Sequence, residues 1–414
     1  MAASQTNIID FKKARAELKR SERLVTLPIR RSRLKSRAAA ILLVALAVAV
    51  SAVALVARFI DNAMYPSDWF NPLSLLVWFV IGLTALACGW ALFDAGSLYQ
   101  NRWWVWGATV LMFWLLWTFG DHYWRYLYLK IGDVHIPSQA FIVMVVVSLT
   151  LLVETQRKRG VWGMYFFAVG LMVVAAASVF FSISLSFLTV FVCIVVIGTA
   201  VARNHYGDRR CRKVFIVGAS IVLLAVASYI IVGTQRVDRL SVFFTDGASD
   251  PLDYDYQFQA ADMIGYASQL LGQLEEMTDE VFLARSLFGY SDYPFLDIGF
   301  VFGRLPSLAV VAACLVTAWL ALRASRYDAN RYGGLITTGL AATIAFQVLF
   351  GILNNYGLTP SASSITVPLG SETGLPLVLH MFMVWALASA LWKPRLPNLT
   401  EPLREKTQRW RKAA

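Results

Sequence analysis

The chain consists of apolar runs, each long enough to cross a membrane, separated by short polar segments. A helix of about 20 apolar residues crosses the roughly 30 Å of hydrocarbon in a bilayer. Hydrophobic residues make up 58% of the 414 residues and charged residues only 15%, a balance that soluble proteins do not show. The sequence therefore predicts an all-α, polytopic membrane protein.

We expect ten spans with both termini in the cytoplasm, because lysine and arginine collect on alternate connections. Residues 1–37 carry eleven basic and three acidic residues, whereas residues 233–296 carry three arginines and eleven acidic residues. The expected spans are 39–58, 71–94, 103–119, 138–153, 161–180, 182–202, 214–232, 297–322, 333–353 and 373–392.

The spans divide the chain into three parts. Residues 1–38 form a basic cytoplasmic arm, residues 39–392 a ten-helix membrane domain, and residues 393–414 a basic cytoplasmic tail. The segment 233–296 is a large extracytoplasmic loop within the membrane domain. The net charge of +11 is explained by orientation against anionic headgroups, so no nucleic acid partner is expected.

Charged residues and histidines are rare in the predicted spans, where Asp297, Arg304 and His380 occur besides Arg58 and Asp94 at the last positions of their spans. Charged side chains in hydrocarbon cost several kcal/mol and are functional candidates for that reason. The lack of a chain of acidic residues argues against a proton-coupled carrier. Asp297 has two interpretations, a helix N-cap or a reactive carboxylate. In the first, Arg304 either reaches back to pair with Asp297 or extends to a polar cavity. For His380 we expect a packed imidazole with a hydrogen-bond partner.

Three extracytoplasmic segments contain the polar residues from which a site could be built. The first, "DHYWRYLYLKIGDVHIPSQ", places Arg125 and Lys130 among aromatic residues, which suits phosphate and sugar binding and equally suits an interfacial belt. The second is the loop 233–296, in which the stretch from Gln257 onwards is expected to be helical. The third, "NNYGLTPSASSITVPLGSE", is rich in turn formers and suits the lining of a polar cavity.

These segments, in this order, resemble the SEDS family (shape, elongation, division and sporulation), which includes peptidoglycan glycosyltransferases with ten spans. The stretch "FQVLFGILNNYGLTPSASSITVPL" is similar to the end of the family's ninth span, and "RVDRLSVFFTDGASDPLDYDYQFQ" to a run of basic residues, Phe, Asp-Pro and Tyr-Gln. In "RYLYLKIGDVHIPSQAF" an Arg precedes Pro-Ser, and "FLDIGFVFG" aligns Asp297 with the family's essential carboxylate.

The resemblance implies a glycosyltransferase that polymerises a polyprenyl-pyrophosphate-linked saccharide, lipid II or a related molecule, at the outer face of the bacterial cytoplasmic membrane. It implies that Asp297 is the catalytic general base. The implied substrate-binding residues match family motifs or lie on the same extracytoplasmic side of the membrane as Asp297. They are Trp124, Arg125, Tyr126, Lys130, Arg236, Arg239, Gln257, Asn355 and Glu372.

The resemblance also implies a partner, a single-span penicillin-binding transpeptidase or another protein of cell-wall synthesis or division. No dedicated metal ligands are visible, although a divalent cation, Mg²⁺ or Mn²⁺, is compatible with a pyrophosphate leaving group.

The sequence departs from the family where Gln139 replaces a Glu and Ile142 replaces a Lys. These departures favour a first alternative, a non-catalytic scaffold that activates a transpeptidase. A second alternative is an O-antigen or exopolysaccharide polymerase or ligase, although such enzymes carry Arg and His in the large outer loop and residues 233–296 contain no His. A lipid or small-molecule transporter is the third.

Overall fold

We analysed a computed structural model of the full chain. The structure describes residues 36–60, 63, 72–92, 100–123, 126–131, 134–137, 142–157, 191–192, 195–196, 199, 216, 220, 263–266, 268–272, 279, 281, 293–324, 331–356, 358 and 374–392. The predicted spans 161–180, 182–202 and 214–232, the N-terminal arm and the C-terminal tail lie outside these residues, apart from the single positions named, and the division into three parts stays a prediction.

The described part is a bundle of apolar helices, as expected for a polytopic membrane protein. Three helices are long and apolar enough to cross a bilayer: Ser36–Ile60, Arg304–Ala324 and Gly334–Asn355. The elements are α2 (Pro72–Leu92), α4 (Arg102–Phe119), α5 (Ile142–Arg157), α12 (Pro294–Phe302), α13 (Arg304–Ala324), α14 (Arg331–Asn355) and α15 (Gly374–Trp392). All seven helices coincide with predicted spans. The total of ten membrane spans stays a prediction.

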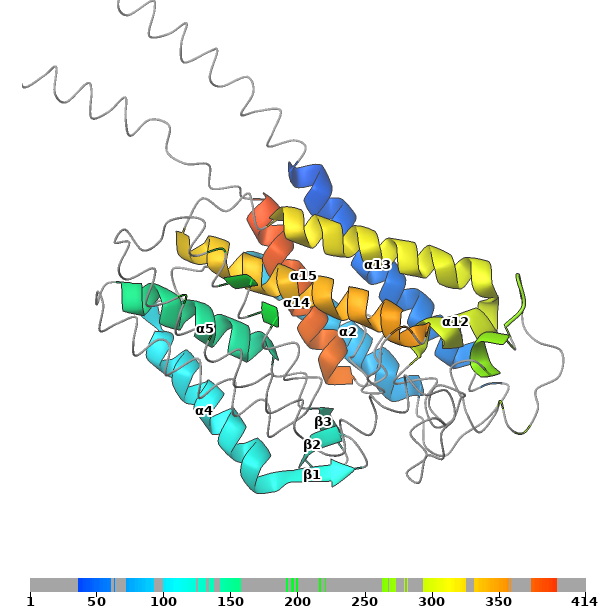
Figure 1. The fold of residues 1–414 in the computed structure, drawn as a ribbon, viewed down its shortest axis with the longest axis horizontal. Helices are drawn as coiled ribbons and strands as arrows, with labels where there is room; N and C mark the ends of the chain where they lie inside the picture. Colours follow the sequence, from blue (N-terminus) through cyan, green and yellow to red (C-terminus); the bar gives the residue numbers. More distant parts are fainter. Residues whose placement is uncertain are drawn as a thin grey trace, which may run out of the picture.

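Helix α14 is the centre of the described bundle (Figure 1) and packs against α5, α12, α13 and α15. In its most apolar window 78% of the residues are buried, against 44% in α13. Helix α2 packs on α15, and α4 packs on the outer side of α5. α13 and α4 thus present apolar faces outward, with Trp319, Trp104 and Trp114 among their exposed side chains, as lipid-facing helices do.

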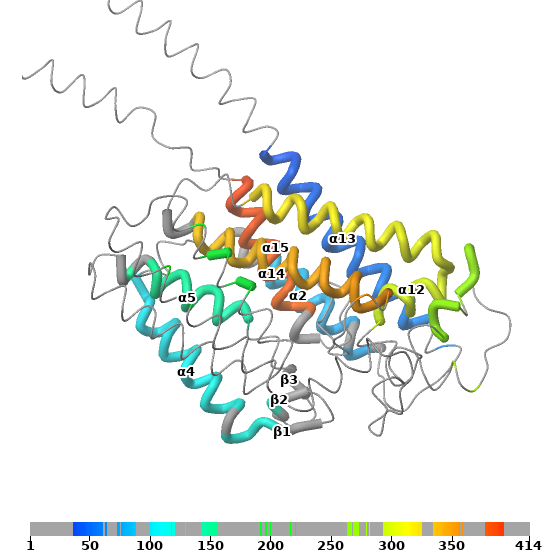
Figure 2. The backbone as a smooth tube through the Cα atoms, in the orientation of Figure 1, coloured from blue at the N-terminus to red at the C-terminus, as the bar shows by residue number. Residues whose placement is uncertain are grey.

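The first and last predicted spans meet at one end of the bundle (Figure 2). The hydroxyl of Ser36 donates to the carbonyl of Leu391, and the Arg37 guanidinium lies 5.2 Å from the centre of the Trp392 ring. The start of the first described helix therefore lies beside the end of the last described helix, as the predicted even number of crossings requires.

Small and polar residues set the packing of α14 against its neighbours. A Cβ on Gly339 would lie 2.6 Å from Cγ1 of Val146 in α5, so the glycine permits this close approach. On the other side, Oε1 of Gln347 and Nε2 of His380 in α15 are 3.1 Å apart, with both side chains buried. His380 is thus the hydrogen-bonded imidazole that the sequence predicts.

The segment after α4, which the sequence analysis treats as a loop, contains a three-stranded antiparallel sheet. Its strands are β1 (Gly120–Tyr123), β2 (Tyr126–Ile131) and β3 (Val134–Pro137), with Tyr123 opposite Tyr126 and Ile131 opposite Val134. The alternating "YLYLKI" followed by Gly132-Asp133 is a hairpin signal. The sheet is a small addition to an otherwise helical fold.

The predicted span 297–322 is wrong as a continuous helix, because the chain breaks at Gly303 between α12 and α13. Gly303 has φ +102° and ψ +164°, a region open essentially to glycine alone. The 268–272 segment fills the break. The N–H groups of Arg304 and Leu305 donate to the carbonyls of Gln269 (2.8 Å) and Leu270 (3.2 Å), and the N–H of Gly272 donates to the carbonyl of Phe302 (3.0 Å). These bonds satisfy backbone groups that a broken helix would leave without partners.

We predict that Gly303→Ala lowers the free energy of unfolding by about 2 kcal/mol or more. The added Cβ would lie 2.6 Å from Cα of Leu271 and 2.8 Å from the carbonyl oxygen of Leu270, and both are backbone atoms that cannot rotate away. Thermal unfolding of the purified protein in detergent measures the loss.

The matched control is Gly107→Ala in the interior of α4, where a Cβ meets nothing within 4 Å. Since alanine is the better helix former, this variant is expected to unfold at the wild-type temperature or slightly above it. If both variants unfold at the same temperature as the wild type, the claim that the helix break requires glycine at position 303 is contradicted.

Candidate functional site

Asp297 lies in the first turn of α12 and is 2% exposed. Phe295, Ile298 and Phe300, its neighbours on the helix, are buried as well. Removing a carboxylate from water costs several kcal/mol unless other groups compensate, and the helix N-terminus supplies part of that compensation through its positive dipole end. A buried carboxylate in an apolar helix is therefore the feature of α12 that packing alone does not explain.

The N-cap interpretation of Asp297 is wrong. The N-cap position is Tyr293, whose side chain makes no capping hydrogen bond, and Asp297 is four residues further on. The capping oxygen comes from α14 instead, because Oδ1 of Asn355 accepts from the N–H groups of Phe295 (2.9 Å) and Leu296 (3.4 Å). Asn355 is held in place by its own Nδ2, which donates to the carbonyl of Gly351 (2.7 Å). Asn355 was expected as a substrate-binding residue, which stays a prediction.

Of the two expectations for Arg304, the pairing with Asp297 is wrong, and the extension to a polar cavity agrees with the structure. The Nε of Arg304 donates to the carbonyl of Ser268 (2.9 Å), and its Nη2 to the carbonyls of Gly265 (3.0 Å) and Tyr266 (3.4 Å). Residues 263–266 form a helical turn, so the guanidinium binds the carbonyl end of that turn, where a cation is favourable. The break at Gly303 is the reason, since it turns α13 out of line with α12.

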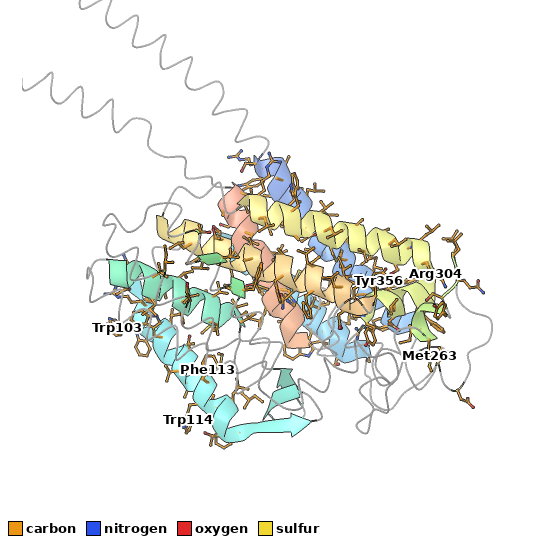
Figure 3. The ribbon with its side chains drawn as sticks, in the orientation of Figure 1. Trp103, Phe113, Trp114, Met263, Arg304 and Tyr356 are labelled. Carbon is orange, nitrogen blue, oxygen red and sulfur yellow. The ribbon has the colours of Figure 1, made fainter. Side chains whose placement is uncertain are left out.

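A cavity of about 290 Å³ lies where α12, α13 and α14 meet the 263–268 region. Figure 3 shows Arg304 and Tyr356 at this end of the molecule, with Met263 nearby. Most of the lining is apolar, and the polar groups come from the side chains of Ser268, Arg304, Ser307, Asn355 and Tyr356.

Ser307 connects α13 to α12 in the wall of this cavity, because its hydroxyl donates to the carbonyl of Phe295 (2.5 Å). Burial raises the pKa of the Tyr356 phenol, and a side-chain hydrogen bond with Ser307 opposes part of that rise. Tyr356 therefore keeps its proton at neutral pH and stays a hydrogen-bond donor at the cavity.

Asp297 does not line this cavity. Phe295, Leu296 and Gly299 do, and at about 100° per residue Asp297 falls on the other side of the α12 axis. Helix α12 thus lies between two chemically distinct regions. Its own buried carboxylate is on one side, and the cavity with the cation and hydroxyls of α13 and Tyr356 is on the other.

Few of the other expected site residues can be placed beside Asp297. The backbones of Tyr126 and Lys130 lie in β2, where Lys130 is opposite His135 in the register. The remaining predictions lie outside the described residues: Trp124, Arg125, Arg236, Arg239, Gln257 and Glu372. Within the described part of the chain no group of three His, Cys, Asp or Glu side chains is placed to hold a metal ion.

Sequence reasoning missed the polar lining of the cavity. Ser307 belongs to no predicted motif, and Tyr356 lies in the predicted motif "FQVLFGILNNYGLTPSASSITVPL" but was not named as a site residue. The role of both depends on the break at Gly303, which brings the start of α13 against the end of α14. One signal was present in the sequence, because "FGRLP" combines a glycine with a proline three residues later inside an apolar run, a pattern typical of helix interruptions.

The fold and this arrangement define the protein as a polytopic helical membrane protein with an interrupted helix at one end of its bundle. No protein-family model matches the sequence, and no curated protein matches it at a significant level. The comparison of structures is informative instead, because several solved chains share the fold.

Two solved proteins illustrate the likeness. A chain from the structure entitled "Structural coordination of polymerization and crosslinking by a peptidoglycan synthase complex" has a TM-score of 0.64 at 16% identity, over 86% of this chain and 98% of that one. The rod shape determining protein RodA of Thermus thermophilus has a TM-score of 0.56 at 15% identity, over 86% of this chain and 97% of that one. An aspartate-to-alanine mutant of the same RodA gives 0.54 at 14% identity.

The chain therefore has the fold of RodA over most of its length. At identities of 14–16% this likeness shows the fold, which is the fold that the family resemblance predicts.

We predict that Asn355→Ala destabilises the start of α12, because the N–H groups of Phe295 and Leu296 lose their acceptor. Losing a cap costs about 1 kcal/mol, which is a roughly fivefold increase in local opening. Amide hydrogen exchange of the peptide that contains these two residues measures the effect.

Thr343→Val is the control, because the Thr343 hydroxyl donates only to the carbonyl of Gly339 within α14 (2.9 Å). Exchange at Phe295 and Leu296 is expected to stay unchanged in that variant. Unchanged exchange in Asn355→Ala as well would show that Asn355 is not the cap of α12.

Proposed function

We propose that the protein is a SEDS-type glycosyltransferase that polymerises a polyprenyl-pyrophosphate-linked saccharide, lipid II or a related molecule, for cell-wall synthesis. The observation that carries the proposal is the RodA fold over 86% of the chain, together with family-like motifs in the family's order. The buried carboxylate of Asp297, at the family's catalytic position, adds chemical support.

In the proposed reaction, a hydroxyl of the acceptor sugar attacks the anomeric carbon of the donor sugar. The new glycosidic bond forms as the bond to the pyrophosphate breaks, and Asp297 accepts the hydroxyl proton as general base. The acceptor approaches α12 on the side of Asp297, away from the cavity. A low-polarity surrounding strengthens the interaction of the carboxylate with that proton.

The departing polyprenyl pyrophosphate gains negative charge, which cations must stabilise. Arg125 and Lys130 are our candidates, with Arg236 or Arg239 as further ones, and Trp124, Tyr126, Gln257, Asn355 and Glu372 complete the proposed substrate-binding set. A divalent cation would serve the same purpose at the pyrophosphate.

The proposed location is the bacterial cytoplasmic membrane, with the reaction at its outer face. One structural neighbour belongs to a peptidoglycan synthase complex in which polymerization and crosslinking are coordinated. By analogy, the partner proposed for this chain is a single-span penicillin-binding transpeptidase.

A non-catalytic scaffold is the second candidate function. Gln139 and Ile142 stand where the family carries Glu and Lys, which removes one acid and one cation from the motif after α4. A scaffold would need the fold and the partner surface but not the reactivity of Asp297.

We predict that Asp297→Asn abolishes polymerisation of lipid-linked saccharide by the purified protein, with a loss of at least about 100-fold. The amide is close to the carboxylate in size but cannot accept the proton. Gel electrophoresis of labelled glycan products measures the activity.

Asp279→Asn is the matched control, since Asp279 is exposed and helical and the same charge is lost. It is expected to keep wild-type activity. Equal activity of the Asp297 and Asp279 variants would refute the role of general base. A wild-type protein without polymerase activity that still stimulates a transpeptidase would establish the scaffold instead.

A further inference from the structure

The cavity beside α12 contains a cation that no described carboxylate neutralises. Arg304 uses Nε and Nη2 on backbone carbonyls, and it forms no ion pair with the acidic residues in the part of the chain that the structure describes. Its Nη1 donates no hydrogen bond to those residues. A guanidinium has five N–H groups in a planar fork, which suits two oxygens of one phosphate.

The place of Arg304 at the end of a membrane-length helix leads us to expect it at the level of lipid headgroups. It is the first residue of α13, a 21-residue helix long enough to cross the hydrocarbon layer. Leu308, one turn further on, is 52% exposed and lines the same cavity. Beyond it, Leu315 and Trp319 continue an exposed apolar stripe along α13.

The other polar groups at the cavity suit the same ligand. Tyr356 is part-exposed and lines the cavity next to Ser307. Since the Ser307 proton is donated to Phe295, the hydroxyl donor available to a ligand is the phenolic O–H of Tyr356, which would turn from Ser307 to the ligand. A phosphate ester carries several strong acceptor oxygens, and a cation with neutral hydroxyl donors is a usual way to bind it.

We propose that this cavity is a binding site for the phosphate of a lipid, held by Arg304 and Tyr356, with the lipid's chain along the exposed stripe of α13. The site lies across α12 from Asp297 and does not depend on the proposed glycosyl transfer. The volume of about 290 Å³ lies near the lower end for small-molecule sites. It suits a headgroup and the beginning of its chains, with the remaining chain outside.

Two sources share this chemistry, the phosphodiester of a membrane phospholipid and the phosphomonoester of a polyprenyl phosphate. Native mass spectrometry of the full-length protein in detergent distinguishes them, with phosphatidylglycerol, polyprenyl phosphate and phosphate-free diacylglycerol titrated separately. We expect one or both phosphate-bearing lipids to bind with a defined stoichiometry, and diacylglycerol to bind at least about tenfold more weakly.

The Arg304→Gln variant removes the charge, and we expect it to weaken binding of the phosphate-bearing lipid about tenfold. Arg323→Gln is the matched control on the same helix, because Arg323 lies in the last turn of α13 over the Trp319 ring. It is expected to leave this binding unchanged.

Leu308→Trp keeps Arg304 and fills the cavity with a larger side chain, so it tests the site even if Arg304→Gln fails to fold. We expect it to reduce binding to a similar extent. Wild-type affinity in Leu308→Trp, or diacylglycerol binding as tightly as both phosphate lipids, would overturn the proposal. Neither variant touches Asp297, so the polymerisation assay reports separately on the proposed function.

Discussion

A broken helix in a membrane bundle needs partners for the backbone groups at the break, and that requirement organises the end of this protein where its candidate chemistry lies. At Gly303 the carbonyl of Phe302 and the N–H groups of Arg304 and Leu305 leave the helical pattern, and the 268–272 segment supplies partners for all three. Gly303 is buried, so each missing bond there would cost several kcal/mol. The long loop before α12 therefore has a structural task, whatever else it does.

The polar side chains nearby serve the same requirement. Asn355 caps the start of α12, Arg304 binds the carbonyl end of the 263–266 turn, and Ser307 donates to the carbonyl of Phe295. Asp297 is a buried carboxylate in the same region, and its proposed reactivity rests on the family resemblance of the stretch around it. The inference of a phosphate site rests on Nη1 of Arg304, whose N–H groups bind no residue in the described part of the chain.

The sequence predicted the helices well because their signal is long and strong. Each described membrane helix coincides with an apolar run, and the positions of α14 and α15 agree within a few residues. The Gln347–His380 contact follows the expectation for a buried histidine. The break at Gly303 was not predicted, because Asp297 to Leu322 is long enough for one span and is apolar, with Asp297 and Arg304 as its only charged residues. The roles of Arg304 and Asn355 depend on which elements meet in space, and no local pattern encodes that. The small sheet was not predicted, although the alternating pattern of "YLYLKI" is typical of a strand.

The most direct measurement of the central claim is a structure of the wild-type protein with a non-reactive pyrophosphate-linked saccharide bound, determined in a lipid nanodisc. The account predicts a sugar hydroxyl within hydrogen-bond distance of the Asp297 carboxylate, on the side of α12 opposite Arg304. It also predicts that the polyprenyl pyrophosphate lies against the segment between α4 and α5. A saccharide bound well away from Asp297, with that carboxylate still enclosed by protein, would contradict the claim that this residue performs the reaction.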